Sequence, residues 1–301
     1  MMMQREILFS IVIPTYNRAS LISETLDSVF SQTYKNYEVI VVDNCSTDNT
    51  EELLQPLILS KKIRYIRNPE NFERAYSRNV GLENAKGDFL TLLDSDDFMY
   101  PDALADAVKF IQEHRDIKVF HNRYELVNDK QEVLYRTPFP SLNNQYKALC
   151  WGNFMSAIGG FIHRDIYTKF RFNLDPKMIG AEDYEFWFQV FARYKVGRIE
   201  KINSGIREHP RRSVHIDAYN NLHYQCKMMV HIINSDPVLK EKFDKYKSRL
   251  AASFKLQEII VNYKNYSFFK KLGLLQKAAQ NDASIIFTKR YLATLINIFK
   301  R

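Results

Sequence analysis

The sequence predicts a doubly wound α/β domain, mainly a parallel sheet flanked by helices, with a separate helical region at its C-terminal end. Short apolar segments rich in β-branched residues alternate with helical patterns over about the first 115 residues, as expected for such a sheet. Acidic or turn-forming residues stand where these apolar segments stop. From about residue 218 the pattern is helical, with lysines beside Phe, Leu and Ile. Because ligands of these sheets bind beyond the carboxyl ends of the strands, the polar residues there are the first candidates for a site.

The first elements are expected to be a strand, a helix and a strand. Residues 9–13 and 37–42 are apolar runs of the kind that a parallel sheet buries on both faces. Between them, apolar residues recur at helical spacing over 21–30, and Ser20 can cap that helix. The later elements, in chain order, are a helix ending near 53, a strand over 63–66, a helix over 73–85, a strand over 89–93, a helix around 104–111, strands over 119–120 and 157–162, an aromatic-rich helix over 184–194 and a strand over 196–202.

Composition indicates an ordinary globular protein of the cytoplasm. The chain has 301 residues, 46% of them hydrophobic, enough to bury a substantial core in one large or two smaller domains. Its three cysteines form no C-x-x-C pair, which favours a reducing compartment. We find neither a signal peptide nor an apolar run of about 18 residues, so we expect neither secretion nor a membrane span.

The positive charge is concentrated at the C-terminal end. The formal net charge is +8, and residues 222–301 contain 15 Lys and Arg against 5 Asp and Glu. Lysines interleaved with large apolar residues suit an anionic membrane surface, which would place the protein peripherally on the inner face of the cell membrane. A packed helical hairpin with solvated lysines is the alternative. No nucleic-acid-binding module is recognisable, so nucleic acid is not an expected partner.

The strongest chemical signal is the run Asp94-Ser95-Asp96-Asp97, directly after the apolar segment 89–93. Mg²⁺ and Mn²⁺ prefer carboxylate oxygens and commonly use one or two of them, while phosphate oxygens complete the shell. We therefore expect Asp96 to be the principal metal ligand, and Asp94 to contact a sugar or ribose or to bridge by water. An Asp-rich turn that caps the next helix is the structural alternative, which the position after a core strand disfavours.

Three further segments place polar groups near the same predicted edge. Thr15, Tyr16 and Arg18 form the loop after the first strand, where backbone N–H groups can meet a nucleotide. Asp43, at the end of the second strand, can accept a hydrogen bond from a base or serve the turn that follows. Arg78 can pair with phosphate, pair with a strand-end aspartate, or stay solvated.

Acidic and cationic residues follow later in the α/β region. Gly180 precedes Glu182 and Asp183 at the start of a predicted helix. These carboxylates either cap the helix or provide a base that takes the proton of an attacking hydroxyl. A cluster of cations and imidazoles farther on suits a leaving diphosphate or a metal. Its members are Arg207, His209, Arg211, Arg212 and His215.

Together these motifs resemble glycosyltransferase family 2, which has the GT-A fold, over about residues 8–215. The resemblance is carried by residues 14–18, Asp43, residues 78–82, residues 94–97 and the pair Glu182-Asp183, in this order and spacing. It implies an inverting transferase that moves a sugar from a nucleotide diphosphate sugar, first among them a UDP-sugar, to an acceptor hydroxyl, with Mg²⁺ or Mn²⁺.

The resemblance also implies roles for individual residues. One residue after the acidic pair would contact metal or diphosphate, and the variable spacing leaves His209, Arg212 and His215 open, the histidines as metal ligands and the arginine as a diphosphate contact. The other assignments are Thr15, Tyr16, Arg18 and Asp43 for the nucleoside, Arg78, Asp94 and Ser95 for the donor, Asp96 for the metal and Asp183 as the base.

We expect residues 1–217 to form the catalytic domain, with a nucleotide-binding half over 1–115 and an acceptor-binding half over 116–217, and residues 218–301 to form the basic appendage. In the family that the chain resembles, the polymerising branch carries a Q-x-x-R-W motif and transmembrane helices. We find neither in this sequence, so single-sugar addition is favoured over processive synthesis. The resemblance implies a role in bacterial surface polysaccharide or lipopolysaccharide assembly, with a glycan or lipid-linked acceptor. The rivals are a sugar nucleotidyltransferase, which the glycine-free loop 14–18 disfavours, and a catalytically silent membrane-associated scaffold. The hypothesis requires the acidic groups near residues 95 and 182 to line one pocket.

Overall fold

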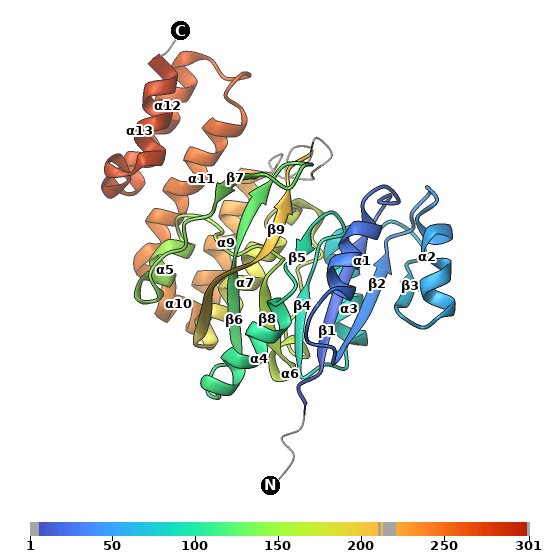
Figure 1. Ribbon diagram of the computed structural model, residues 1–301. Coiled ribbons are helices and arrows are strands. Elements are labelled where there is room, and N and C mark those ends of the chain that lie inside the picture. Colours follow the sequence, from blue (N-terminus) through green and yellow to red (C-terminus); the bar gives the residue numbers. More distant parts are fainter. Residues whose placement is uncertain (1–5, 210–211, 213–220, 300–301) are drawn as a thin grey trace. The chain divides into compact units, whose positions relative to one another are not determined.

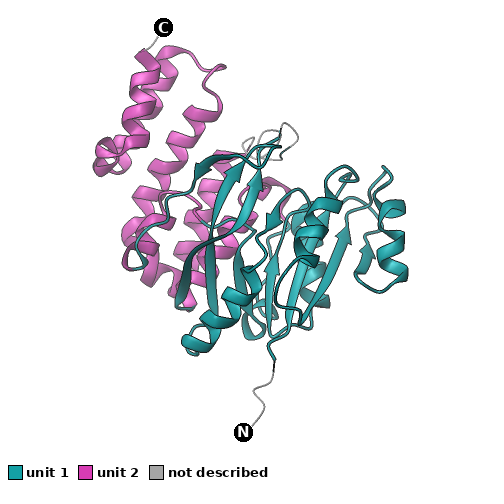
Figure 2. Cartoon of the chain, viewed as in Figure 1, with its two compact units in different colours: residues 1–142, 155–174, 194–212 teal, residues 143–154, 175–193, 213–301 magenta. Residues whose placement is uncertain are grey.

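The computed structural model describes residues 6–209, 212 and 221–299, and the chain divides into two compact units (Figure 2). The sheet unit comprises residues 1–142, 155–174 and 194–212. The helical unit comprises residues 143–154, 175–193 and 213–301. The domain boundary predicted at residue 217 lies outside the described residues.

The described strands belong to one mixed, nine-stranded sheet in the sheet unit (Figure 1). Its order is β3-β2-β1-β4-β8-β6-β9-β5, with β7 paired to β6. The first four strands of this order are parallel, as are β6 and β9, whereas β8 runs antiparallel to β4 and β6. The strands are β1 Phe9–Thr15, β2 Tyr37–Asp43, β3 Arg64–Arg67, β4 Phe89–Leu92, β5 Phe98–Met99, β6 Val119–Val127, β7 Val133–Arg136, β8 Gly160–His163 and β9 Val196–Arg207.

β1 is buried along its whole length because both of its faces are covered. Ile11 packs in one core cluster with Ile22 of α1. Val12 points to the opposite face and meets α3 at Gly81, where an added Cβ would lie 2.1 Å from the Val12 side chain. The helices of the sheet unit are α1 Ile22–Phe30, α2 Thr50–Leu59, α3 Glu73–Asn84, α4 Ala103–Glu113 and α6 Arg164–Tyr167.

Most predicted elements are confirmed, and the differences lie at their ends. The cap predicted at Ser20 is wrong, because α1 follows Leu21 without a side-chain cap. Instead the carbonyl of Arg18 accepts from the N–H groups of Leu21 and Ile22, each at 2.9 Å. The helix predicted to end near residue 53 continues to Leu59. The strands predicted over 119–120 and 196–202 extend to the ends of β6 and β9, which pair with each other in parallel.

The described part of the helical unit consists of helices and loops. Aromatic residues of α7 form much of its core, and the ring of Phe188 lies 4.4 Å from that of Phe243. A second cluster joins the last three helices around Leu256, Leu275 and Ile298. None of the described helices has the length and apolar character needed to cross a bilayer. The described α-helices of this unit are α5 Gln145–Leu149, α7 Glu182–Arg193, α9 Leu222–Ser235, α10 Pro237–Phe243, α11 Lys247–Val261, α12 Phe268–Asn281 and α13 Lys289–Phe299.

Candidate functional site

The carboxyl ends of β1, β2 and β4 meet at one edge of the sheet (Figure 1). Thr15 is the register partner of Asp43, and Leu92, at the end of β4, is the partner of Val12. The loops that follow these strands therefore lie next to one another, as the sequence predicted. We call this group the strand-end site. It comprises Thr15, Tyr16, Arg18, Asp43, Arg78, residues 94–97 and His209.

The acidic turn after β4 attracts two guanidinium groups and an imidazole. Asp94 Oδ1 lies 3.1 Å from Arg78 Nη2. Asp96 Oδ2 lies 3.2 Å from Arg18 Nη2 and 3.1 Å from His209 Nε2. The Asp94 and Asp96 side chains are 34% and 15% exposed, so a ligand can reach both carboxylates.

Asp97 holds the turn in place from the inside. Its N–H donates to the carbonyl of Asp94 at 3.0 Å, and its buried Oδ1 accepts from the backbone N–H of Arg207 at 3.0 Å. Its own carbonyl accepts from Thr25 Oγ1 at 2.8 Å. Burial raises the pKa of Asp97 well above the usual range, and the charge of Asp96 beside it raises it further. Asp97 thus ties the turn to β9 and α1.

The end of β9 brings His209 to the site. Arg207 is buried, pairs with Glu24 at 3.0 Å, and places its guanidinium 5.2 Å from the ring centre of Phe98. β9 approaches the same ring at Gly205, where an added Cβ would come within 2.1 Å of it. This close packing fixes the end of β9, two residues before His209.

The cationic cluster predicted after β9 separates into different environments. His209 is the member that the structure brings to Asp96. Arg212 pairs with Glu208 at 2.6 Å, and its binding of diphosphate stays a prediction. His215 lies outside the described residues, so its metal role also stays a prediction.

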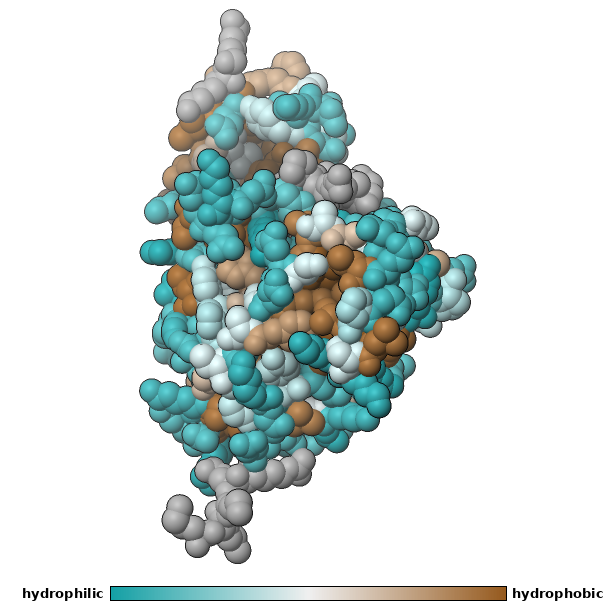
Figure 3. All heavy atoms as spheres, turned by 45° about the vertical axis from the view of Figure 1, so that its right-hand side comes forward, coloured by the Kyte–Doolittle hydropathy of each residue, from teal (hydrophilic) through white to brown (hydrophobic). Residues whose placement is uncertain are grey.

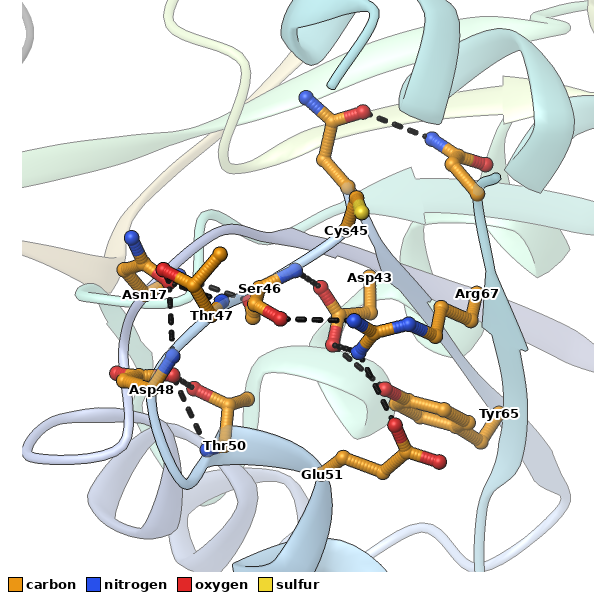
Figure 4. Close-up of polar contacts among 12 residues, drawn as sticks. Asn17, Asp43, Cys45, Ser46, Thr47, Asp48, Thr50, Glu51, Tyr65 and Arg67 are labelled. Carbon is orange, nitrogen blue, oxygen red and sulfur yellow. Dashed lines mark hydrogen bonds and ion pairs between the residues drawn. The ribbon is translucent and has the colours of Figure 1, made fainter. Parts of the chain in front are cut away.

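Asn17 holds the loop after β1, a role that the sequence analysis did not assign. Its φ of 52° is left-handed, a conformation that Asn tolerates. Asn17 Oδ1 accepts from the N–H groups of Thr47 at 2.8 Å and Asp48 at 3.3 Å (Figure 4). Its own N–H donates to Ser46 Oγ at 2.9 Å. An Asn within a predicted turn was the available signal, and these bonds fix the loops after β1 and β2 to each other.

Asp43 is fully buried and accepts hydrogen bonds from within the sheet unit. Oδ1 accepts from the N–H of Ser46 at 2.8 Å, which is the predicted turn role. Oδ2 accepts from the Tyr65 hydroxyl at 2.5 Å and lies 3.5 Å from Arg67 Nη1 (Figure 4). Burial, together with the bond to Asp43, raises the pKa of Tyr65. A nucleoside contact by Asp43 stays a prediction.

The other predicted residues of the site differ in exposure. Arg78 is 3% exposed and lies 5.5 Å from the ring of Phe172, so it is not a solvated charge. Thr15 Oγ1 is buried and has no hydrogen-bond partner among the described residues. Because most buried polar groups are paired, this hydroxyl is available to a ligand. Tyr16, the next residue, is 41% exposed, and Ser95 is buried.

A metal ion at this site would have few protein ligands. Across residues 6–209, 212 and 221–299, no group of three or more His, Cys, Asp or Glu side chains is arranged to hold a metal ion. Asp96 and His209 offer one carboxylate and one imidazole. Mg²⁺ commonly binds one or two carboxylates, and substrate phosphates complete its shell. The donor set therefore fits a divalent ion that binds together with a diphosphate, and this metal role stays a prediction.

Asp183 lies in the helical unit, in the first turn of α7. Its Oδ2 accepts from Asn153 Nδ2 at 3.0 Å, which orients the half-buried carboxylate. Glu182 is buried and accepts from the N–H of Gly180 at 2.6 Å, where Gly180 has a φ of 88°. Asp183 Oδ1 also accepts from the N–H of Tyr184 at 2.8 Å, so both carboxylates support the start of α7. The proximity of Asp183 to the strand-end site stays a prediction.

Known proteins resemble this chain in sequence. Residues 10–171 match the sequence model of Glycosyl transferase family 2. A Rickettsia felis protein named as an uncharacterized glycosyltransferase is 30% identical over 278 residues, which cover 89% of this chain and 44% of that protein. The chain spans about half the length of the first curated relatives that it matches.

Solved structures share the fold. S. aureus TarS 1–349 in complex with UDP-GlcNAc has a TM-score of 0.69 and 20% identity, covering 97% of this chain and 89% of that chain. The mannosyltransferase PcManGT from Pyrobaculum calidifontis in complex with GDP-Man and Mn²⁺ has a TM-score of 0.57 and 19% identity, covering 96% and 85%. These likenesses confirm the predicted GT-A fold. Since the family match extends over more than half of its residues, the chain belongs to glycosyl transferase family 2.

Proposed function

We propose that the protein is an inverting glycosyltransferase that moves a single sugar from a nucleotide diphosphate sugar to an acceptor hydroxyl. The convergence of Arg18 and His209 on Asp96, beside the Arg78–Asp94 pair, carries the proposal. This edge of the sheet combines carboxylates for a divalent ion with guanidinium groups for a diphosphate. Within a family-2 chain, that combination fits a donor of this class.

The donor is expected to be a UDP-sugar. The likeness to a TarS structure that contains UDP-GlcNAc supports this choice. In the sheet unit, Thr15 offers its buried hydroxyl and Tyr16 its exposed ring to the nucleoside. Asp43 retains acceptor capacity on Oδ1, which accepts from Ser46 and has a second lone pair. Ser95 and Asp94 would meet the diphosphate and the sugar.

Asp96 and His209 are the residues that would hold Mg²⁺ or Mn²⁺, and the likeness to a mannosyltransferase structure that contains Mn²⁺ supports this assignment. The ion would stabilise negative charge on the leaving diphosphate. Arg18, which now pairs with Asp96, has the planar geometry that binds phosphate oxygens in pairs. Arg212 and, beyond the described residues, His215 are further proposed contacts.

Asp183 is the proposed base. The acceptor oxygen forms a bond to the anomeric carbon, the bond from that carbon to the phosphate oxygen breaks, and the hydroxyl proton passes to the Asp183 carboxylate. The nucleoside diphosphate leaves with the bonding electrons. One displacement inverts the anomeric centre and needs a single carboxylate, whereas retaining glycosidases use two. The bond from Asn153 keeps one carboxylate oxygen of Asp183 oriented.

We also propose that the C-terminal helices bind an anionic membrane surface, where a lipid-linked acceptor would reside. An exposed apolar face lies on α12 and α13, and hydrophobic residues appear among hydrophilic ones over these helices, at the top of Figure 3. Lys270 and Lys271, on α12, supply positive charge beside it. Apolar side chains flanked by lysines suit anionic headgroups. The members of this apolar face are Phe268, Phe269, Leu292, Ile296 and Phe299.

The pathway that we propose is bacterial surface polysaccharide or lipopolysaccharide assembly, with a glycan or lipid-linked acceptor. The test of the activity is release of nucleoside diphosphate from a panel of UDP-, GDP- and dTDP-sugars in the presence of Mn²⁺. Asp96→Ala and Asp183→Asn are expected to abolish acceptor-dependent turnover. Asp116→Asn is a matched control, because this exposed carboxylate of the sheet unit pairs with the exposed side chain of Lys195 and is not part of the strand-end site.

Wild-type turnover in either site variant would contradict the assigned roles. A nucleotidyltransferase would instead release pyrophosphate from a nucleoside triphosphate and a sugar phosphate. A catalytically silent scaffold would bind UDP without turnover of any donor. Measuring both phosphate products therefore separates the proposal from these two alternatives.

A further inference from the structure

A cavity of about 380 Å³ lies within the helical unit, and donor binding as proposed above does not use it. Sites for small molecules commonly measure about 300–1,000 Å³. Its lining comes from α7, α9, α11 and α13 and from residues 152–153 and 180–181. Ile260 lines it and is 44% exposed, so the cavity reaches the surface.

Arg290 gives the lining of the cavity a positive charge. The Arg290 guanidinium donates to the carbonyl of Trp151 and to Ser253 Oγ, both at 3.3 Å, and to the amide oxygen of Gln257. These bonds hold the planar group in place, and a fixed guanidinium binds phosphate or carboxylate with paired hydrogen bonds. None of the described lining residues is acidic. The lining therefore favours an anion.

Aromatic and amide groups form the rest of the lining that matters here. The rings of Tyr184 and Phe254 are 6.3 Å apart with an interplanar angle of 27°. Aromatic faces of this kind pack against the C–H groups of a sugar ring, while amides such as those of Asn153 and Gln257 can bond its hydroxyls. The chemistry of the cavity thus suits a sugar that carries an anionic group.

The cavity is one side chain away from the proposed base. Asn153 lines it and donates through Nδ2 to Asp183 Oδ2 at 3.0 Å. Tyr184, which also lines it, follows Asp183 directly in α7. A sugar that contacts both Arg290 and Asn153 would therefore lie next to the carboxylate that takes the hydroxyl proton.

We infer that this cavity is the acceptor site and that the acceptor is a sugar bearing a phosphate or carboxylate group. Arg290 binds the anionic group, Tyr184 and Phe254 hold the ring, and Asn153 joins the lining to Asp183. The assignment of this cavity to the acceptor rests on the proposed function. The expectation that the cavity binds an acidic sugar rests only on its lining residues.

The experiment is calorimetric titration of the full chain with glucose 6-phosphate, glucuronic acid, glucose and inorganic phosphate. Arg290→Gln keeps a polar side chain and removes the charge. Ile260→Glu adds a negative charge at an exposed position, where misfolding is not expected. Both are expected to weaken binding of the acidic sugars by about tenfold or more. Lys289→Gln, the neighbouring exposed cation on α13, is the control and should bind as the wild type does.

The relative affinity for glucose 6-phosphate and glucuronic acid identifies which anionic group the cavity takes. The inference fails if glucose binds as tightly as the acidic sugars, if inorganic phosphate alone binds as tightly as the sugar phosphate, or if neither variant weakens binding. UDP binding and donor hydrolysis are measured on the same variants and should not change. If the wild type neither bound UDP nor hydrolysed a donor, the proposed function would be refuted. Binding of acidic sugars would still support the cavity as their site.

Discussion

Replacing Asp43 with Asn tests the buried carboxylate at the end of β2. Its two close hydrogen bonds, from Ser46 at 2.8 Å and Tyr65 at 2.5 Å, end on a charged acceptor that is fully buried. Bonds to charged groups contribute about 1.5–3 kcal/mol and neutral ones about 0.5–1.5 kcal/mol. The amide keeps the size of the side chain and removes the charge. We therefore expect the free energy of unfolding of the sheet unit to fall by about 2 kcal/mol, roughly 1 kcal/mol for each bond.

Hydrogen exchange of peptides from β1 and β2, followed by mass spectrometry over a urea series, reports the opening of the sheet unit separately from that of the helical unit. A double-mutant cycle with Tyr65→Phe should give a coupling energy of about 1 kcal/mol. The cycle with Arg67→Gln should give a smaller coupling, because the Arg67 side chain is 38% exposed and lies 3.5 Å away.

A fall in the free energy of unfolding of less than about 0.5 kcal/mol in Asp43→Asn would lie within the ordinary range of a surface substitution. The hydrogen bonds to Asp43 in Figure 4 would then not stabilise the loops after β1 and β2. A large loss of UDP affinity in that same variant would then assign the carboxylate to the nucleoside. Equal losses of stability and affinity would show that the loops after β1 and β2 form the nucleoside site only when Asp43 holds them.

Three further predictions concern other parts of the chain. Burial lowers the pKa of His121 to about 3, so between about pH 6.5 and that value the unfolded chain binds a proton that the folded chain does not. The stability contributed by neutral His121 should be fully present above pH 6.5 and should fall with acidification by up to about 1.4 kcal/mol per pH unit. Urea midpoints measured over this pH range should therefore depend less on pH in His121→Gln than in the wild type. Gly205→Ala should shift Phe98 and lower both thermal stability and turnover, since the new Cβ would lie within 2.1 Å of that ring, whereas unchanged values would mean that β9 yields freely. The double variant Leu292→Ser with Ile296→Ser should no longer sediment with vesicles of anionic lipid, whereas the control variant Leu59→Ser, at an exposed apolar position of the sheet unit, should sediment as the wild type does. A change in the oligomeric state of the double variant without vesicles would instead assign the apolar face to a second copy of the chain.

The sequence predicted the first half of the sheet well because burial on both faces requires continuous apolar runs. β1 and β2 are such runs, and their parallel alignment places Thr15 opposite Asp43. The meeting of Asp43 and Asp94 at one edge needed no further information, since parallel strands end on the same side. Arg78 was left with three alternatives, and its burial in α3 against Asp94 depends on packing that no local pattern reports.

The remaining features depend on contacts between distant residues. β8 enters the sheet between β4 and β6 and runs antiparallel to both, which local periodicity does not specify. The bond between Asp97 and Arg207 joins residues 110 positions apart. Sequence alone therefore did not separate Asp97, which anchors the turn, from Asp94 and Asp96, which stay accessible. The predicted Ser20 cap failed for the same reason, because a backbone carbonyl already satisfied the first N–H groups of α1.

The arrangement around Asp96 bears on how donor and metal would bind. Its Oδ2 already lies within 3.2 Å of Arg18 and 3.1 Å of His209, so the charge of the carboxylate is compensated inside the protein. Another cation can use this oxygen only by displacing part of that compensation, which makes binding of a divalent ion by itself unfavourable. Arg18 displaced from Asp96 could then bind a diphosphate, whose oxygens match its planar guanidinium group. Metal and nucleotide should therefore favour each other's binding through Arg18, and linkage requires the effect to be equal in both directions.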